Sequence, residues 1–473
     1  MKKKLVSAFL CAAMVTTMLA GCGSSDNKGT EAGANDKTPE SETTKQTVAG
    51  DPSKEDAFVV WGWNEDIKKI LDSCFATENK DDYARIVFVN SGGSDYYQTQ
   101  IDPVLQDKGN QLYPDLMGLE IDYVQKYVQS GQLLSMKDLG ITESDLKNQY
   151  TWIRQVCSTE SEPTADNQYA SFWQSTPGGW ALRADLCQEY LGTTDPAALQ
   201  EMFSTWDKVE ETAKIVSDKG NGSCKLLSGW DDLMRVYSNN RKVGWSKDDT
   251  ITIDPQIKAY FEEAKKFADN DWTFNTTQWK DDWTAMMAGT GKDGSKAALA
   301  YTGCPWFQYW SLNHDVWAGQ TITIPGPMSY FWGGTGLAVP EACSDKELAA
   351  KIIKYFTCDK TSMQTIAKFN CDFINNKEAN KELLADSENI KTEKGTLANG
   401  NGLMNSQNYI QVFSDILDNM TVDASFVTAE DKTIGDNLRT YVQEYIDGKS
   451  YEEAEQDLIN YIHDTYSYLN LPE

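Results

Sequence analysis

Four short segments place a tryptophan beside polar or flexible residues at the predicted end of a strand. They read WGWNED (61–66), SGWDD (228–232), TGCPW (302–306) and YFWGG (330–334). An indole buries roughly 150–250 Å² and presents an electron-rich face. The C–H face of a pyranose fits such a ring, while the sugar hydroxyls bond to carboxylates, amides or the indole N–H at its rim. These segments predict stacking chemistry with a sugar, in which no covalent bond changes.

The tryptophan content of the whole chain is unusual. There are 15 Trp against 16 Phe, and 22 Tyr. For any single Trp taken alone, the simpler interpretation is favoured, namely that the ring fills the core or covers a helix. The ligand interpretation gains weight only at strand ends beside polar side chains, where α/β proteins bind their ligands.

Motifs for covalent catalysis are missing from the sequence. There is no phosphate loop, dinucleotide fingerprint or GxSxG elbow, and the chain has only two His. Acid pairs such as Asp231 and Asp232 could serve a glycosidase, whose carboxylates lie roughly 5 to 10 Å apart. Sequence does not show that separation, so a surface-anchored carbohydrate-active enzyme stays open as an alternative.

Charge excludes one class of partner. The chain carries 43 Lys and Arg against 71 Asp and Glu, a net charge of −28. Nucleic acid is not expected as a partner, because binding it needs basic stripes that release counterions. The acidity instead permits a neutral or a cationic ligand.

The first residues read as a lipoprotein signal. MKKK is followed by the apolar run LVSAFLCAAMVTTM and by LAGC, which ends in Cys22. Cleavage before Cys22 and acylation of its sulfur would anchor the mature chain to the membrane. The segment after it is poor in large apolar side chains, so we expect a flexible tether over residues 22–54.

Cysteine usage does not indicate a metal site. Of ten Cys, Cys11 leaves with the signal and Cys22 carries lipid, and the other eight form no CxxC motif. With two His, zinc is not expected, and neither is any other metal or cofactor. Some of Cys343, Cys358 and Cys371 could pair in an oxidising exterior, but buried thiols are favoured.

Strand and helix patterns alternate along the chain, which is typical of an α/β protein with largely parallel sheets. Predicted strands cover 58–63, 84–90, 113–120, 225–229, 296–303, 319–325 and 334–340. Predicted helices cover 64–75, 94–109, 122–136, 254–269, 345–357 and 451–468.

One long segment, YPDLMGLEIDYVQKYVQSGQLLSM (113–136), resembles the extracellular solute-binding proteins of ABC sugar importers, of the maltose-binding type. Similar segments follow the family order at 58–66, 179–196, 295–306, 333–356 and 448–462. The resemblance implies a two-lobed, periplasmic-binding-protein-like fold of type II, hinge-linked, with a mostly parallel sheet in each lobe. The expected division is signal 1–21, tether 22–54, N-terminal lobe 55–175 plus 336–400, and C-terminal lobe 176–335 plus 401–473.

The resemblance also implies ligand-binding residues in the N-terminal lobe. The first loop would bring Trp63, Asn64 and Glu65 to the cleft, and the PD segment would bring Asp122 as an acceptor for sugar hydroxyls. Tyr123 follows where the maltose type has a basic residue, which argues against maltose itself.

In the C-terminal lobe, Trp230 matches an aromatic that faces sugar, and Trp306 matches the stacking Trp. Tyr97, Trp173 and Trp332 lie near crossings or loops and are further candidates for the cleft, with core packing as the alternative.

The expected function is capture of a carbohydrate, with a neutral oligosaccharide favoured, and its delivery to ABC permease subunits. Lobes joined near 172–178, 329–338 and 395–405 would close on the ligand like a hinge. We expect a monomer, held by lipid on Cys22 at the outer face of a Gram-positive type of membrane. A binding protein for a non-sugar solute such as a polyamine is a further alternative.

Overall fold

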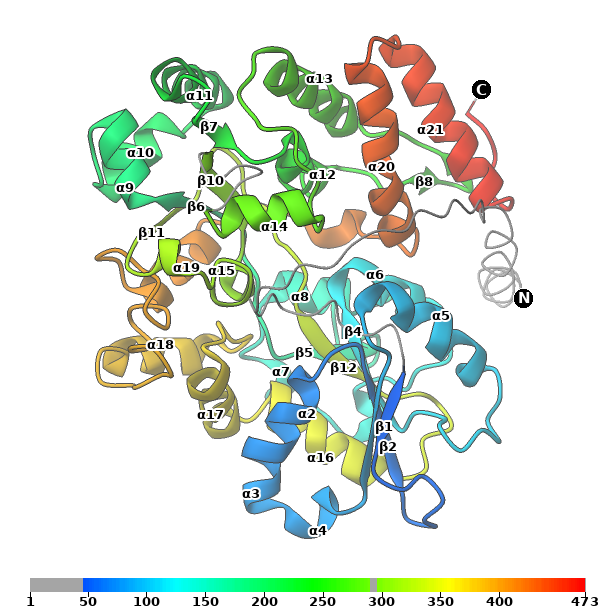
Figure 1. Cartoon of the computed structure of the whole chain (residues 1–473). Helices are drawn as coiled ribbons and strands as arrows, with labels where there is room; N and C mark the ends of the chain where they lie inside the picture. Colours follow the sequence, from blue (N-terminus) through cyan, green and yellow to red (C-terminus); the bar gives the residue numbers. More distant parts are fainter. Residues whose placement is uncertain (1–45, 290–295, 473) are drawn as a thin grey trace, which may run out of the picture.

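The computed structural model describes residues 46–289 and 296–472. The chain forms two lobes, one above the other in Figure 1, and passes between them more than once. Among the described residues, no helix has the length and apolar character needed to span a membrane. The expected signal segment and Cys22 lie outside the described residues.

The lower lobe is built on a six-stranded sheet, in the order β1-β3-β2-β4-β12-β5. Its strands are β1 (Thr47–Ala49), β2 (Phe58–Gly62), β3 (Ile86–Asn90), β4 (Leu116–Glu120), β5 (Ala170–Phe172) and β12 (Thr335–Ala338). The residues of β2 are all buried, as the apolar run FVVWG predicts for a strand covered on both faces.

Helices pack around this sheet in the lower half of Figure 1. They are α2 (Asp66–Ile70), the π-helical η2 (Leu71–Phe75), α3 (Ala76–Glu78), α4 (Lys80–Tyr83), α5 (Ser94–Leu105), α6 (Ile121–Val128), η3 (Lys137–Leu139), α7 (Glu143–Leu146), α8 (Thr151–Val156), α16 (Lys346–Thr357), α17 (Lys360–Asn370) and α18 (Lys377–Asp386). Helix α16 shows the expected amphipathic pattern, and its Ile352, Ile353 and Phe356 are fully buried in the lower core.

The upper lobe has a four-stranded sheet in the order β11-β6-β10-β7, and a small β8–β9 hairpin. Its strands are β6 (Gly179–Arg183), β7 (Cys224–Leu227), β8 (Ser246–Lys247), β9 (Thr250–Ile251), β10 (Ala297–Gly303) and β11 (Thr321–Ile324). Its helices are α9 (Ala184–Leu186), η4 (Cys187–Leu191), α10 (Pro196–Met202), α11 (Trp206–Gly220), η5 (Trp230–Leu233), α12 (Met234–Ser238), α13 (Pro255–Asp269), α14 (Asp281–Met287), α15 (Pro305–Trp310), η6 (Asp315–Trp317), α20 (Asp431–Ile446) and α21 (Tyr451–Thr465).

The expectation of mostly parallel sheets is wrong. Only β2–β3, β2–β4 and β7–β10 pair in parallel, and the other pairings of the described strands in the two large sheets are antiparallel. The antiparallel partners include strands that flank the crossings between lobes, namely β5, β6, β11 and β12. A buried apolar run has the same pattern in either direction, so the sequence does not encode this orientation.

Two further boundaries differ from expectation. Residues Thr47–Ala49, expected in the tether, pair antiparallel with β3 as the edge strand β1. Helix α19 (Tyr409–Asp418) and the turn η7 (Ala424–Phe426), expected in the C-terminal lobe, bury their apolar side chains in the same cluster as the lower sheet. A lobe boundary just before α20 fits this packing better than one at residue 400.

Two crossing segments run side by side between the lobes. Trp332 N–H donates to Thr176 O (3.2 Å), and Thr176 Oγ1 donates to Gly333 O (2.8 Å). The Tyr330 hydroxyl donates to Gly179 O (2.6 Å), which ties this segment to the upper sheet. A Cβ at Gly178 would lie 2.3 Å from the Tyr330 ring, so only glycine fits there. The crossings are therefore pinned at their upper ends.

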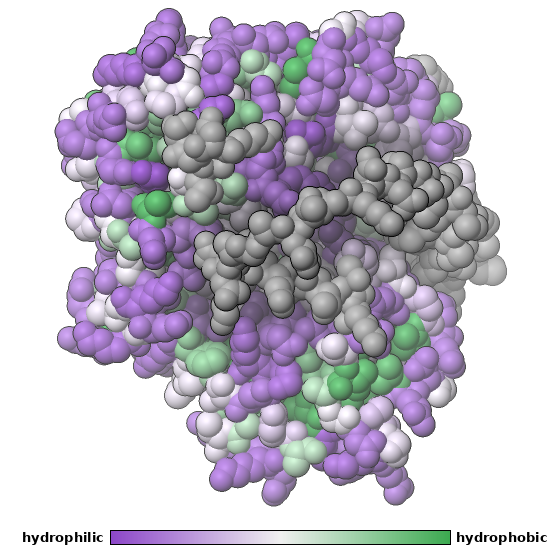
Figure 2. Space-filling view, in the orientation of Figure 1, coloured by the Kyte–Doolittle hydropathy of each residue, from purple (hydrophilic) through white to green (hydrophobic). Residues whose placement is uncertain are grey.

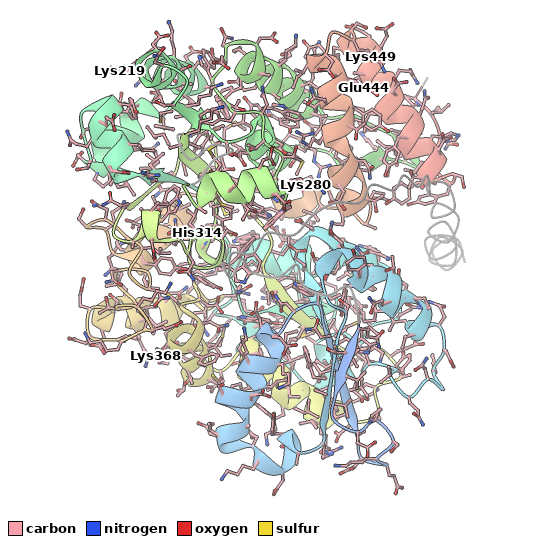
Figure 3. All side chains as sticks on the ribbon, viewed as in Figure 1. Lys219, Lys280, His314, Lys368, Glu444 and Lys449 are labelled. Carbon is pink, nitrogen blue, oxygen red and sulfur yellow. The ribbon has the colours of Figure 1, made fainter. Side chains whose placement is uncertain are left out.

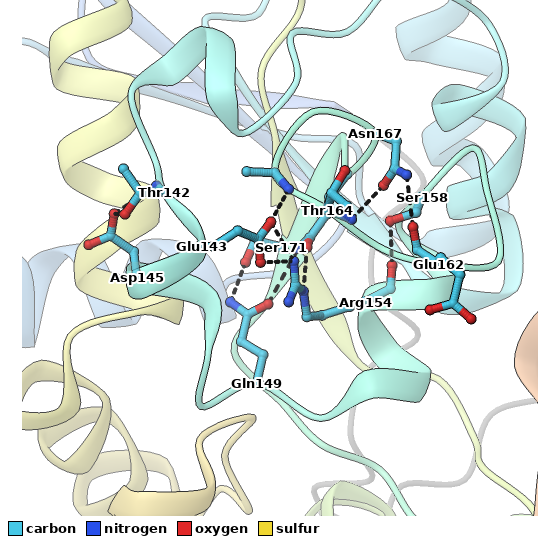
Figure 4. A network of polar contacts seen from close by, with 12 residues as sticks. Thr142, Glu143, Asp145, Gln149, Arg154, Ser158, Glu162, Thr164, Asn167 and Ser171 are labelled. Carbon is cyan, nitrogen blue, oxygen red and sulfur yellow. Dashed lines mark hydrogen bonds and ion pairs between the residues drawn. The ribbon is translucent and has the colours of Figure 1, made fainter.

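A partly buried polar network fixes the lower end of the first crossing (Figure 4). Arg154 in α8 donates from Nη2 to Glu143 Oε2 (3.0 Å) and from Nε to Gln168 Oε1 (2.9 Å). Gln149 Nε2 donates to Ser171 Oγ in β5 (2.8 Å). Because β5 leads directly into the crossing, these bonds hold the point at which the chain leaves the lower lobe.

All eight described cysteines are free thiols, and only Cys358 among them is not fully buried. This agrees with the favoured interpretation of buried thiols. No group of three His, Cys, Asp or Glu within the described ranges is arranged to hold a metal ion.

Candidate functional site

A cleft of about 400 Å³ lies between the two lobes. It is within the size range of small-molecule sites, roughly 300–1,000 Å³. Figure 2 shows mainly hydrophilic surface around the visible part of the hollow. The lining residues are Trp63, Asn64, Asp66, Gly92, Gly93, Ser94, Asp95, Tyr96, Glu120, Asp122, Gln174, Arg235, Trp279, Trp306, Tyr309, Trp310, Trp332, Gly334, Thr335, Lys432 and Asp436.

The upper wall of the cleft is formed by indole rings. Strand β10 ends at Gly303, and Pro305 at the first position of α15 starts the helix that carries Trp306. The ring of Trp306 meets Trp332 edge to face at 5.3 Å and lies nearly parallel to Trp279, at 6.4 Å and 13°. Trp306 Nε1 donates to Trp332 O (2.9 Å). Trp279 is 50% exposed, so its face is open to the cleft.

Trp279 is held by a frame of buried hydrogen bonds. Its φ of 66° is unusual for a bulky residue and must be imposed by its neighbours. On one side, Gln278 N–H donates to Asp231 Oδ2 (3.0 Å) and its side chain donates to Asp232 Oδ1 (3.1 Å). On the other, Trp283 Nε1 donates to the same Asp232 oxygen (3.0 Å). Both ends of the turn thus rest on one acid pair.

This acid pair is buried in the upper lobe. Asp231 accepts from Arg439 Nε (2.9 Å), which supplies a counter-charge. Burial, followed by the neighbouring charge of Asp231, raises the pKa of Asp232 to about 7. The pair serves the frame, because its oxygens accept from the turn and neither residue lines the cleft.

The lower wall is assembled from the ends of three neighbouring parallel strands. Trp63 and Asn64 follow β2, the Gly92–Gly93 turn follows β3, and Glu120 ends β4. Because carboxyl ends of parallel strands meet at one sheet edge, residues far apart in sequence gather here. Behind this edge, Trp63 packs against Tyr97 at 5.7 Å and Tyr123 at 6.2 Å, edge to face in both cases.

Charged groups from both lobes meet across the cleft. Arg235 in α12 forms an ion pair with Asp122 in α6 (2.7 Å), and its guanidinium lies 4.4 Å from the Trp332 ring centroid. Lys432 pairs with Asp436 (2.5 Å) within α20. Glu120 has no ion-pair or hydrogen-bond partner among the described side chains. Burial and the nearby Asp122 charge raise the pKa of Glu120 to about 8.

The floor of the cleft contains an amide clamp. Gln174, in the first crossing, donates from Nε2 to Asp372 Oδ1 (2.8 Å) and accepts from Thr335 N–H (2.9 Å). The Tyr309 hydroxyl also donates to Asp372. Burial raises the pKa of Asp372. The clamp thus joins both crossings to α15, the helix that carries Trp306.

Five of the nine predicted ligand-binding residues line the cleft: Trp63, Asn64, Asp122, Trp306 and Trp332.

The other four do not line the cleft. Glu65 accepts from Asn90 Nδ2 (2.6 Å). Tyr97 is fully buried behind Trp63. Trp173 is buried and donates from Nε1 to Asp372 (3.2 Å). Trp230, expected to face sugar, lies in the upper core with 1% exposure.

Sequence reasoning missed several lining residues, above all Trp279, Glu120 and Arg235. Glu120 could have been found, because it ends a strand two residues before Asp122. Trp279 sits in an irregular turn, and Arg235 pairs with a residue 113 positions away. No local pattern marks either of them.

Comparison with known families defines the class of protein. The sequence model for bacterial extracellular solute-binding proteins matches residues 73–394, and the chain belongs to this family. Comparison with the sequences of curated proteins finds no significant match.

Solved structures show the same two-lobed, periplasmic-binding-protein-like fold. An extracellular solute-binding protein of family 1 matches with a TM-score of 0.71 and 14% identity, over 87% of this chain and 99% of that one. An ABC-transporter-associated binding protein from B. animalis subsp. lactis, in complex with β-1,6-galactobiose, matches with a TM-score of 0.65 and 17% identity, over 88% of this chain and 100% of that one. The GacH receptor of Streptomyces glaucescens, studied unliganded and with acarbose, matches with a TM-score of 0.63 and 15% identity, over 87% of this chain and 98% of that one. At these identities the likeness is one of fold.

Proposed function

We propose that the chain captures an oligosaccharide in the interlobe cleft and delivers it to the permease of an ABC importer. One observation carries the proposal: open indole faces on the upper wall stand opposite carboxylate and amide groups on the lower wall. Sugar rings stack on the former and donate hydroxyl hydrogens to the latter. Two proteins of similar fold are described in complex with β-1,6-galactobiose and with acarbose. The sequence favours a neutral oligosaccharide.

The ligand would act by closing the lobes. Trp63 and Asp122 belong to one lobe and Trp306 to the other, so a ligand can touch all three only when the lobes approach. Shifting the open-to-closed ratio from 1:99 to 99:1 requires about 5.5 kcal/mol of differential affinity. Two stacked rings and several hydrogen bonds can supply that energy.

The contact residues in this proposal are Trp63, Asn64, Asp122, Trp306 and Trp332, to which the structure adds Trp279 and Glu120. Glu65, Tyr97, Trp173 and Trp230 are proposed to support the walls from behind. The ligand is held without covalent chemistry.

Anchoring through lipid on Cys22, a monomeric state and a place on the exterior surface complete the proposal. Replacing Cys22 with Ala should release the protein from membranes in a fractionation experiment. Retention of the Cys22→Ala protein in the membrane fraction would overturn the anchor.

The function is tested by titrating neutral oligosaccharides of different linkages while following tryptophan fluorescence and thermal unfolding. We expect a saturable response to a subset of them and a smaller radius of gyration by small-angle scattering. If amino acids or polyamines shift both signals and no saccharide does, the carbohydrate assignment fails. Release of reducing ends from a polysaccharide would instead show the enzyme alternative.

A further inference from the structure

The charges that line the cleft do not balance. Both lining bases are already paired, Arg235 with Asp122 and Lys432 with Asp436. Three lining acids, Asp66, Asp95 and Glu120, form no direct ion pair with the residues that the structure describes, although Lys432 and Arg235 lie near enough to Glu120 to act on its charge. The lining thus contains five acids and only two bases, within a chain whose net charge is −28. Glu120, whose pKa is about 8, holds a proton in the unliganded cleft near neutral pH and becomes a carboxylate when a cation displaces that proton.

Glu120 is the carboxylate best placed to use this charge. It ends β4 in the lower lobe, where the second crossing passes beside it. A Cβ on Gly333 would lie 2.9 Å from Glu120 Oε1 and 3.3 Å from Trp306 Nε1. The carboxylate and the indole thus border the same small volume, which glycine leaves free. The Trp332 face is occupied by Arg235, whereas Trp279 and Trp306 have no cation over them among the described residues.

A carboxylate beside indole faces suits one chemical group better than others. A protonated amine gains a charge-assisted hydrogen bond from the carboxylate and a cation–π attraction from the rings. A hydroxyl or an acetamide can also donate a hydrogen bond to this carboxyl group, but it forms no ion pair with it and gains no cation–π attraction from the rings. A uronic acid would add like charge to the cleft.

We propose that the saccharide bound in this cleft carries a protonated amino group, which Glu120 binds beside Trp306. The inference rests on the proposed function and refines the expectation of a neutral saccharide that composition alone suggests. Lys280, at the lower edge of the upper lobe in Figure 3, is exposed and does not line the cleft, so water screens its charge.

The experiment compares sugars that differ in one substituent. Glucosamine, N-acetylglucosamine and glucose form one series, galactosamine, N-acetylgalactosamine and galactose a second, and the β-1,4-linked trimers of the first series a third. Each is titrated at pH 6.5 and followed by calorimetry and thermal shift. Because unliganded Glu120 holds a proton at this pH, binding of the amino member should release a proton to the buffer, which calorimetry in two buffers measures. In at least one series the amino member should bind about ten-fold or more tighter than its hydroxyl and acetamido counterparts, as expected for a desolvated charge pair.

Two variants locate the effect. Glu120→Gln should reduce the preference for the amino member to within about two-fold, because the amide keeps the shape but, unlike the carboxyl, cannot lose a proton to form an ion pair with the amine. Glu388→Gln removes an exposed carboxylate outside the cleft lining and should leave the preference unchanged. Raising the salt concentration should weaken amino-sugar binding more than neutral-sugar binding.

The outcomes separate the two proposals. If hydroxyl or acetamido members bind as tightly as the amino member in every series that binds, or if Glu120→Gln retains the preference, the amino-group inference is overturned and the saccharide function stands. If no amino sugar binds, the inference is likewise overturned. If no saccharide of any kind binds while spermidine does, both proposals fail.

Discussion

The two walls of the cleft are built by different means. The upper wall is a set of rings fixed to one another and to a buried acid pair, all within one lobe. The lower wall is a set of charged and polar groups at strand ends, and its Asp122 finds its ion partner only across the gap, at Arg235. The upper wall is therefore held by contacts within one lobe, whereas the lower wall also depends on a contact with the other lobe. If the lobes close on a ligand as proposed, only the lower wall changes its contacts during that movement.

The largest expected effect comes from removing the central ring of the upper wall. Trp306→Ala should weaken saccharide binding about 100-fold, since a central buried indole is typical of residues that contribute 2 kcal/mol or more. Calorimetry with the tightest-binding saccharide measures the change. Phe369→Ala, which removes a 46% exposed ring outside the cleft lining, is the control and should cost less than about two-fold. Equal losses in the two variants would contradict a fixed upper wall.

The frame under Trp279 comes next. Asp232→Ala leaves the donors of Gln278 and Trp283 without their acceptor and should lower the free energy of unfolding by about 2 kcal/mol. Binding should weaken as well, because the turn that carries Trp279 loses its support. Denaturant unfolding and calorimetry measure the two effects. Asp281→Ala, at the exposed start of α14, should change the stability by less than about 1 kcal/mol.

Breaking the ion pair across the gap tests the lower wall. Asp122→Asn should shift the unliganded protein towards the open form, with a cost to closure of about 1 kcal/mol. Small-angle scattering should show a larger radius of gyration without ligand. Lys68→Met breaks an exposed ion pair with Asp72 inside the lower lobe and should leave the radius unchanged. An unaltered radius in Asp122→Asn would mean that the pair does not hold the lobes together.

The smallest effect is a pH dependence that distinguishes the walls. The raised pKa values of Glu120, about 8, and Asp232, about 7, mean that these carboxyls hold protons in the folded state which the unfolded chain releases. Stability from these groups is therefore present at low pH and is lost as pH rises towards 7 and 8, at no more than about 1.4 kcal/mol per pH unit for each proton. Glu120→Gln should flatten the loss between about pH 5 and 8, and Asp232→Asn the loss between about pH 4 and 7. Chemical denaturation from pH 5 to 8.5 measures both effects. Glu263, in α13 and outside the cleft, also has a raised pKa, of about 7, and Glu263→Gln measures its separate contribution to the pH dependence.

The sequence predicted the lower wall better than the upper one. Trp63, Asn64 and Asp122 follow β2 and β4, and residues after parallel strands gather at one edge by a general rule. Trp306 could be predicted from the sequence for a similar reason, since it follows the end of strand β10. Trp279 depends on hydrogen bonds to Asp231 and Asp232, about 50 residues earlier, and sequence periodicity carries no information about such contacts.

Prediction of the fold from the sequence is limited in the same way, because contacts between distant segments leave no local pattern. Element types followed from apolar periodicity, as in α13 and α16, whose ends also carry the caps Asp254 and Asp345. Strand direction did not, because antiparallel β12 has a run as buried as parallel β2. The core position of Trp230 likewise depends on packing beside Tyr260 and Arg439 rather than on its neighbours in the chain.

Gly333 and Gly334 form the joint between the lobes along the second crossing. Trp332 belongs to the aromatic cluster of the upper lobe, and Thr335 begins a strand of the lower sheet, so just these two glycines, at φ of 59° and 110°, separate the lobes along this crossing. Tyr330 anchors the segment immediately above them. A sugar resting against Trp306, whose indole N–H donates to Trp332 O, would press on residues next to the joint. Ligand binding and the hinge motion of the lobes would then involve the same short segment, and no conformational change would have to pass through the core of either lobe.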